Sequence, residues 1–369
     1  MSERLFATTA PGLEEALEDE CRALVLAPRV LPGGVEVEGP AGLHRTLNLR
    51  LRSASRVLLR VGEFPAPDAR ALSAGLSRIP LAHHVPAGTP AVVKASVNES
   101  RLARKDYLEQ AARTAFRLLP LSAQEDEAVP RVFVRVAKDV CTVSVDTSGE
   151  LLHRRGYRQE VSRAPIRESL AAGLLLLAGY DGKRPFWDPF CGSGTFVLEA
   201  ALMACGWSPG IHRHFAFEHF PCFDEAARAA WEVEKGRARL EVHASHPPLW
   251  GTDIHAGALG AARRNGRRAE VLAAVHLERK DVAVLEPPKG MAHGVLVTNP
   301  PYGIRVGEVD QLRPLYAAFG KTLRRAFHGW TVGVLAPEGP LLDALGVTFQ
   351  RRHAVQNGGI RCTFAVGSP

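Results

Sequence analysis

Apolar and polar residues follow two different periods in the first 150 positions. The stretches RLFATT and VEVEG have the pattern of strands, and between them Leu13, Ala16, Leu17 and Cys21 recur on one face of a helix. Further along, TPAVVKASV predicts a strand, SRLARKDYLEQAARTAFRLL an amphipathic helix, and RVFVRVAKDVCTVSVD a hairpin-like pair of strands. A proline-rich joint, EFPAPDAR, separates the two groups. The pattern predicts two small units of mixed helix and strand, at residues 1–62 and 63–150.

The pattern changes after residue 150. A basic connector covers residues 151–164, and from 165 to 369 short apolar runs alternate with helical stretches. This alternation is typical of doubly wound α/β domains. The second half therefore predicts an α/β fold with a mostly parallel sheet.

A glycine-containing turn follows the first apolar run of this α/β half. The run ends at Asp188, and Gly192 and Gly194 then allow the backbone to approach a ligand closely before a helix begins. The spacing is not G-x-x-x-x-G-K-[ST], which excludes a triphosphate cradle, and it is not a full G-x-G-x-x-G. Taken alone, the turn is also compatible with a plain tight turn.

Two more acids follow strand-like runs downstream. Asp253 comes after the second run, where a carboxylate can accept both hydroxyl hydrogens of a ribose, and Asp281 after the third, where it can accept from an exocyclic amine. Asp188 can meet a positively charged group. Three such acids in one α/β block favour a nucleoside cofactor over three solvated loop residues.

The stretch GVLVTNPPYG ends a fourth apolar run abruptly. Pro300 and Pro301 have no backbone N–H groups and fix φ, so a buried strand cannot continue through them. The sequence predicts a rigid corner that presents Asn299 and Tyr302.

The series DPFCGSGTF, GTDI, KDV and TNPPYG resembles the motifs of class I S-adenosylmethionine methyltransferases that act on amines. The resemblance implies a Rossmann-like domain with S-adenosylmethionine as cofactor and no metal. It implies roles for Asp188, Cys191, Gly192 and Gly194 at the methionine end, Asp253 and Ile254 at the ribose, Asp281 and Val282 at the adenine, and Phe190, Thr195 and Asn299 elsewhere in the cofactor site.

The residues of the corner suit methyl transfer to an exocyclic base amine. The side-chain carbonyl of Asn299 and the backbone carbonyl of Pro300 can accept the two amine hydrogens, and Pro301 makes the corner rigid. Tyr302 offers a ring on which a base can stack. We expect these four residues to be catalytic, chiefly by positioning.

The catalytic motif does not choose the substrate, because N-P-P-Y occurs in DNA adenine-N6, RNA guanine-N2 and protein glutamine methyltransferases. The first half resembles a ferredoxin-like domain followed by a THUMP RNA-binding domain. The stretches PGIHRHFAFEHFPCFDE and QNGGIRCTF resemble the bacterial THUMP-containing 23S rRNA guanine-N2 methyltransferases. The resemblance implies ferredoxin-like and THUMP α+β domains before the methyltransferase domain, and 23S rRNA as the partner. Many relatives carry a second fused methyltransferase domain, which we expect to be absent from this chain of 369 residues.

Three alternatives stay open. A tRNA guanine-N2 methyltransferase would share this layout, a DNA adenine-N6 methyltransferase would share the corner, and a non-catalytic RNA-binding or ribosome assembly factor could retain the fold. The sequence does not fix the oligomeric state, although a monomer is favoured.

A net charge of +7 is compatible with an RNA partner. Arginines at 45, 50, 52, 56 and 60 form one group, and Arg113 and Arg117 extend a second. We expect phosphate contacts from Lys94, Arg101, Arg104, Lys105, Arg154, Arg155 and Arg158. For any single arginine, a solvated surface is the alternative.

The remaining signals point to no metal, membrane or disulfide. Six scattered cysteines form no C-x-x-C pair, and no apolar run approaches the ~20 residues that a bilayer requires. We therefore expect a cytoplasmic protein. His212, His214, His219 and Cys222 lack the spacing of a zinc site, and we expect their aromatic loop to cover the target base instead.

Overall fold

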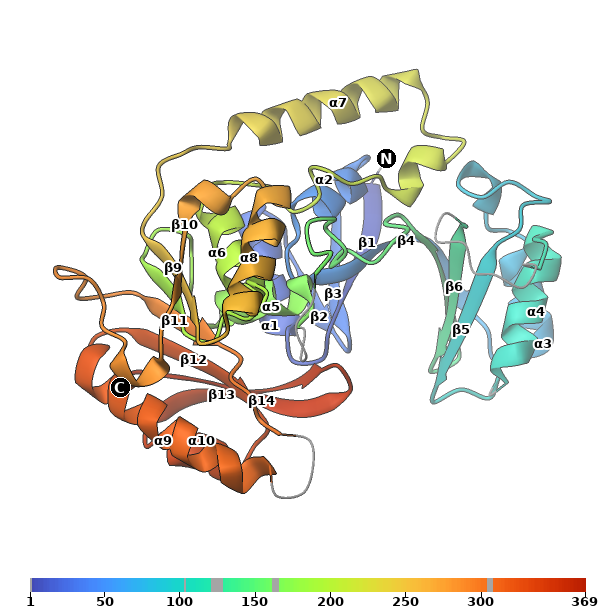
Figure 1. Cartoon of the computed structure of the whole chain (residues 1–369). Helices are drawn as coiled ribbons and strands as arrows, with labels where there is room; N and C mark the ends of the chain where they lie inside the picture. The colour runs from blue at the N-terminus through green and yellow to red at the C-terminus, as the bar shows by residue number, and fades with distance from the viewer. Residues whose placement is uncertain (1, 103, 121–128, 161–165, 304–307) are drawn as a thin grey trace.

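The computed structural model describes residues 2–102, 104–120, 129–160, 166–303 and 308–369. The chain folds around two seven-stranded sheets, one from each half of the sequence (Figure 1). Each sheet has its own buried apolar cluster. None of the described helices is long and apolar enough to cross a membrane.

The first sheet has the strand order β2-β3-β1-β4-β7-β6-β5. Its strands are β1 (Ser2–Thr9), β2 (Arg29–Leu31), β3 (Gly34–Pro40), β4 (Ala54–Pro65), β5 (Val92–Asn98), β6 (Arg131–Ala137) and β7 (Val140–Asp146). Its helices are α1 (Glu14–Ala23), α2 (Leu43–Arg50), α3 (Ala69–Leu76) and α4 (Lys105–Phe116). The helix and strand periods in the sequence predicted β1, α1, β3, β5, α4 and the β6–β7 pair, but they did not single out β2 or α3.

Strand β4 connects the two predicted N-terminal units. It pairs with β1 on one side and β7 on the other, and it runs through the predicted boundary at residue 62. The units 1–62 and 63–150 therefore share one continuous sheet. Sequence periodicity identifies strands but does not show which strands share a sheet, and the division into two domains stays a prediction.

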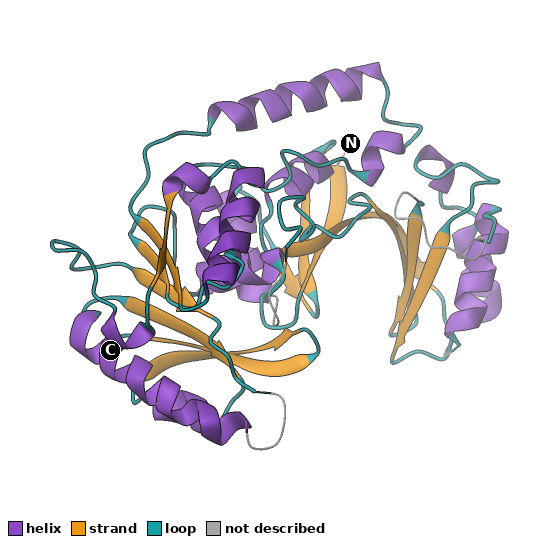
Figure 2. Ribbon diagram, in the orientation of Figure 1, coloured by secondary structure: helices purple, strands orange, loops and turns teal. Residues whose placement is uncertain are grey.

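The second sheet has the order β10-β9-β8-β11-β12-β14-β13, parallel except for β14. Its strands are β8 (Phe186–Asp188), β9 (Leu249–Asp253), β10 (Val275–Arg279), β11 (Val295–Thr298), β12 (Thr331–Ala336), β13 (Phe349–Asn357) and β14 (Ile360–Gly367). Helices cover both faces (Figure 2): α5 (Glu168–Leu177), α6 (Thr195–Ala204), α8 (Ala256–Arg268), α9 (Glu308–Ala326) and α10 (Pro340–Ala344). The predicted Rossmann-like α/β fold is confirmed.

The strand order reverses direction between β8 and β11. From β8 the chain moves to β9 and β10 on one side, and from β11 to β12 on the other. In open parallel sheets, ligands bind outside the carboxyl ends of the strands at such a point. The topology therefore predicts a site beyond Asp188 and Thr298.

A segment of the second half, residues 207–241, packs on the first half. Phe215, Phe217, Phe220 and Trp231 belong to the apolar cluster of the N-terminal sheet. Helix α7 (Glu225–Leu240) lies across the top of Figure 1 and contacts α2, where Arg45 donates to the Ala227 carbonyl. The expectation that this loop covers the target base is wrong, because its aromatic side chains are buried in a core. Such burial is not visible in local sequence.

The described part of the basic connector, residues 151–160, is packed and carries buried charges. Arg155 lies 2.6 Å from Glu199 on α6, and both side chains are almost fully buried. Tyr157 donates to the same carboxylate at 2.7 Å, and Arg155 also donates to the Arg52 carbonyl in the N-terminal half. Burial raises the pKa of Tyr157 well above its ordinary value, so its hydroxyl remains a donor. The connector therefore joins the two halves through a hydrogen-bonded ion pair.

Replacement of Glu199 by Gln should destabilise the protein by about 3 kcal/mol or more, because it leaves the Arg155 charge buried without its counterion. Denaturant unfolding measures this loss. The control is Arg352→Gln, which removes an exposed pair with Glu338 and should cost less than about 1 kcal/mol. Equal effects of the two variants would contradict the role assigned to the buried pair.

Candidate active site

Four strands of the second sheet deliver polar side chains to one cavity. Asp188 ends β8, Asp253 ends β9, Asp281 follows β10 and Asn299 follows β11. All four line a cavity of about 1120 Å³. Carboxyl ends of parallel strands meet at one edge of a sheet, and this brings Asp188 and Asn299, which are 111 positions apart in sequence, into one cavity.

The glycine turn forms one wall of the cavity. Gly192 and Gly194 have φ of 52° and 91°, a region that favours glycine. A side chain on Gly194 would also meet Ala262 at 3.0 Å. Gly194 does not line the cavity, so the structure gives no support to its predicted contact with the methionine end of the cofactor. Its positive φ and its packing against α8 instead assign it to the shape of the turn.

Cys191 is buried inside this turn. Burial and the carboxylates of Asp188 and Asp253 raise the pKa of its thiol well above the ordinary value. A protonated thiol is a weak nucleophile, which favours a role for Cys191 as part of the cavity wall.

Asp188 is held at the point where the strand order reverses. Its Oδ1 accepts a hydrogen bond of 2.7 Å from the Thr298 hydroxyl and one of 3.2 Å from the Phe190 amide. Burial, with a smaller contribution from the Asp253 charge, raises its pKa to about 7. The carboxyl group is thus poised to ionise when a positive charge lies beside it. The sequence prediction missed Thr298, although it directly precedes Asn299.

Asp253 supports the glycine turn and also borders the cavity. Its carboxylate accepts from the Gly192 amide at 2.9 Å and from the His255 amide at 2.8 Å. Each carboxylate oxygen has a second lone pair, so ribose hydroxyls can still donate to it. The next residue, Ile254, lines the cavity with 51% of its surface exposed, and it offers apolar area that a flat ligand would cover.

Asp281 and Val282 form the far end of the cavity. Asp281 accepts from the Ala283 amide at 2.9 Å, and Val282 is buried. Leu312 and Leu315 from α9 line the cavity as well. Sequence reasoning missed the α9 residues because they follow the corner with no local motif.

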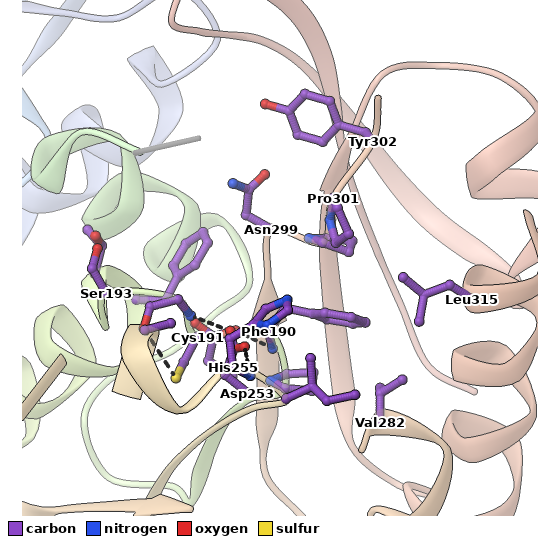
Figure 3. A pocket seen from close by; sticks show the side chains of 18 of the residues that line it. Phe190, Cys191, Ser193, Asp253, His255, Val282, Asn299, Pro301, Tyr302 and Leu315 are labelled. Atoms are coloured by element: carbon purple, nitrogen blue, oxygen red, sulfur yellow. Dashed lines mark hydrogen bonds between the residues drawn. The ribbon is translucent and has the colours of Figure 1, made fainter. Parts of the chain in front are cut away.

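The corner occupies the other side of the cavity (Figure 3). Strand β11 ends at Thr298, as predicted, and Asn299, Pro300, Pro301 and Tyr302 all line the cavity. In Figure 3, Asn299 lies between the glycine turn and the ring of Tyr302. Tyr302 is 5% exposed, so only a small part of its ring faces open space.

The predicted RNA contacts divide into two kinds. Lys94, on the edge strand β5, is exposed, and so are Arg101, Arg104, Lys105 and Arg154. Arg155 and Arg158 instead lie against Glu199 and Glu168, with side chains 2% and 12% exposed. These two guanidinium groups hold the connector in place and are not available for the predicted phosphate contacts.

The earlier arginine group is also engaged within the protein. Arg50 pairs with Glu241 at 2.7 Å, Arg60 with Glu36 at 3.3 Å, and Arg56 with Asp146. Arg52 donates to the Trp207 carbonyl at 2.6 Å. The arginine-rich stretch of residues 45–60 contains no acidic residue, and acids distant in sequence pair with three of its arginines. In the described part of the chain, no group of three or more His, Cys, Asp or Glu side chains could hold a metal ion.

The strand order, the glycine turn and the acids after successive strands define a class I methyltransferase fold. Comparison with known families agrees. Residues 155–365 match the family described as RMKL-like, methyltransferase domain, and residues 4–58 match the RlmL ferredoxin-like domain. The chain belongs to the RMKL-like methyltransferase family, which confirms the resemblance inferred from its motifs.

Two curated relatives show the extent of the similarity. The chain is 37% identical over 377 residues to "Ribosomal RNA large subunit methyltransferase K/L" of Syntrophotalea carbinolica, covering 97% of this chain and 52% of the relative. It is 31% identical over 371 residues to "Putative RNA methyltransferase slr0064" of Synechocystis sp., covering 97% and 94%. The chain thus spans about half the length of the K/L relative.

Solved structures match over the whole chain. SMU.472, complexed with SAH, has a TM-score of 0.84 at 29% identity, covering 100% of this chain and 98% of that one. A protein described as a predicted N6-adenine-specific DNA methylase from Listeria monocytogenes has a TM-score of 0.87 at 30% identity, covering 100% and 97%. SAH is S-adenosylmethionine without its methyl group, and the cofactor of this family is S-adenosylmethionine. The three carboxylates and the exposed Ile254 fit its cationic, ribose and adenine parts.

Binding of S-adenosylhomocysteine should strengthen about tenfold between pH 6 and pH 8. The pKa of Asp188 is about 7 in the free protein, so its carboxyl group is largely neutral at pH 6 and ionised at pH 8. The cationic amino group of the ligand favours the ionised form, and binding at low pH should therefore release a proton. Calorimetry in buffers of different ionisation enthalpy measures both the affinity at each pH and the number of protons released.

The control for this dependence is Asp188→Asn, which should weaken binding and flatten its pH profile. An unchanged pH profile in this variant would show that a group other than Asp188 titrates.

Proposed function

We propose that the protein transfers the methyl group of S-adenosylmethionine to the exocyclic N2 amine of a guanosine in 23S rRNA. The observation that carries the proposal is the position of the Asn299 to Tyr302 corner in the same cavity as the three cofactor carboxylates. At about 1120 Å³ the cavity exceeds the ~300–1,000 Å³ typical of small-molecule sites, which leaves room for a base beside the cofactor.

The corner would act by orienting a weak nucleophile. The lone pair of an exocyclic amine is delocalised into the base, and acceptance of its hydrogens by the Asn299 side chain and the Pro300 carbonyl would localise that pair on nitrogen. Bound S-adenosylmethionine supplies a methyl group on a positively charged sulfur. Because formation of the N–C bond would make the amine nitrogen acidic, its proton would pass to water. Asn299 therefore needs to position the amine but not to act as a base.

The names of the relatives support RNA as the substrate. The K/L relative acts on large-subunit ribosomal RNA by its name, and the Synechocystis relative is named as an RNA methyltransferase. The exposed cations Lys94, Arg101, Arg104 and Lys105 would add phosphate contacts without base specificity. We propose residues 63–150 as the THUMP domain that carries them.

The name of the Listeria relative favours a second candidate, adenine-N6 methylation of DNA. The corner is compatible with either amine. The ribosomal RNA name of the more similar curated relative decides our preference, and the substrate assay below separates the two.

Asn299→Ala should lower methyl transfer at least about 100-fold, because the amine loses the acceptor that orients it. The assay incubates purified protein with labelled S-adenosylmethionine and 23S rRNA from cells that lack the protein, and identifies the methylated nucleoside by mass. Binding of S-adenosylhomocysteine to the variant should weaken much less than methyl transfer, although Asn299 also lines the cofactor cavity, because the three carboxylates are intact.

Parallel incubations contain tRNA and duplex DNA. Label in tRNA alone would replace the rRNA assignment, and N6-methyladenine in DNA would replace the RNA assignment. Tight RNA binding without turnover, unchanged in Asn299→Ala, would support a non-catalytic RNA-binding protein.

A further inference from the structure

The hydroxyl group of Tyr302 is held by hydrogen bonding. The Asn357 side-chain amide donates to the Tyr302 hydroxyl at 3.0 Å, and both residues are at least 95% buried. The Cys362 thiol interacts with the same hydroxyl. Burial, followed by Cys362, raises the pKa of Tyr302, so the hydroxyl stays neutral while it accepts from Asn357.

Asn357 comes from the far edge of the second sheet. It is the last residue of β13 and pairs with Ile360, the first residue of β14. Gly358 and Gly359 form the connecting turn with φ of 57° and 88°, so the glycines satisfy the backbone demand of the turn. An asparagine is therefore not required at position 357 for the turn, and its buried amide has a different task.

The register of the hairpin places its polar groups selectively. Cys362 pairs with Val355, and Asn357 lies two residues beyond Val355 on the same face, since strand side chains alternate. Gln356, between them, is exposed. The inner face thus carries the two groups that meet Tyr302, and Gln356 provides a control from the outer face.

We propose that Asn357 is a positioning residue that holds the Tyr302 ring as a fixed wall of the compartment for the target base. This inference rests on the proposed function, because it assigns Tyr302 to the base. Two prolines fix the backbone on one side of Tyr302, and the hydrogen bond fixes the opposite end of its side chain. A ring held at both ends loses no further freedom when a base arrives, which favours productive orientation.

Tyr316 provides a matched comparison. It lies on α9, is buried, and interacts electrostatically with Tyr302 and Cys362. Its hydroxyl has no hydrogen-bond partner among the residues that the structure describes, and its side chain does not line the cavity. Removal of one phenolic oxygen from either tyrosine is the same chemical change in the same neighbourhood.

The test is a double-mutant cycle on methyl transfer with Asn357→Ala, Tyr302→Phe and the combination. Each single variant should lower kcat/KM for RNA about tenfold, since each deletes the same buried hydrogen bond, and the double variant should be no worse than the poorer single one. Tyr316→Phe and Gln356→Ala should stay within about twofold of the wild type. Binding of S-adenosylhomocysteine should be unchanged throughout.

Additive losses in the double variant would overturn the inference, because Asn357 would then act independently of the Tyr302 hydroxyl. Equal losses in Tyr302→Phe and Tyr316→Phe would also overturn it. If Asn357→Ala does not fold, Tyr302→Phe deletes the same bond from the other partner and is compared with Tyr316→Phe.

A second readout does not depend on methyl transfer. The chain has five tyrosines, so fluorine NMR of protein labelled with 3-fluorotyrosine gives few resonances, and the Tyr302 resonance is the one lost in Tyr302→Phe. Asn357→Ala should shift or broaden that resonance and leave that of exposed Tyr107 unchanged. If the Tyr302 resonance changes in Asn357→Ala but the wild type does not methylate RNA, Asn357 does hold the Tyr302 ring and the proposed function is rejected. If the wild type methylates RNA but the resonance does not change, the role of Asn357 in holding the ring is rejected.

Discussion

The hydrogen bond between Thr298 and Asp188 joins the two strands at which the topology of the sheet reverses. It is 2.7 Å long, buried, and links the last residue of β11 to the last residue of β8. The glycine turn follows one of these residues and the Asn-Pro-Pro-Tyr corner follows the other, so this contact, together with the pairing of β8 and β11, helps to set the relative position of two sides of the cavity. Because Asp188 is also the buried acid whose pKa is raised to about 7, the same contact helps to determine the charge of the site.

The other structural connections extend outward from this pair. Helix α6 begins at the glycine turn, and one turn later its Glu199 binds Arg155 of the connector. Arg155 in turn contacts the N-terminal half, and the segment 207–241 packs in the core of that half. On the other side, the hairpin of β13 and β14 reaches Tyr302. The N-terminal sheet is therefore joined by packed contacts to the methyltransferase domain.

Motif spacing predicted the cavity well, because its residues follow strands whose ends must converge. The residues predicted in this way are Asp188, Asp253, Asp281 and Asn299. The prediction failed where distant residues determine the role of a side chain. Arg155 has the same local sequence signal as exposed Arg154, yet Glu199, 44 positions later, buries it. Thr298 acquires its role from Asp188 on β8, and Asn357 acquires its role from Tyr302 in the corner after β11, 110 and 55 positions away in sequence, and no local pattern shows this.

The central claim is that the corner at Asn299 methylates guanine N2 in 23S rRNA. The most direct measurement is mass mapping of modified nucleosides in 23S rRNA from a strain that lacks the protein, complemented with the wild-type chain or with Asn299→Ala. The account predicts that one N2-methylguanosine is absent from the deletion strain, returns with the wild-type chain, and does not return with the variant. An unchanged set of N2-methylguanosines in the deletion strain, or restoration by Asn299→Ala, would contradict it.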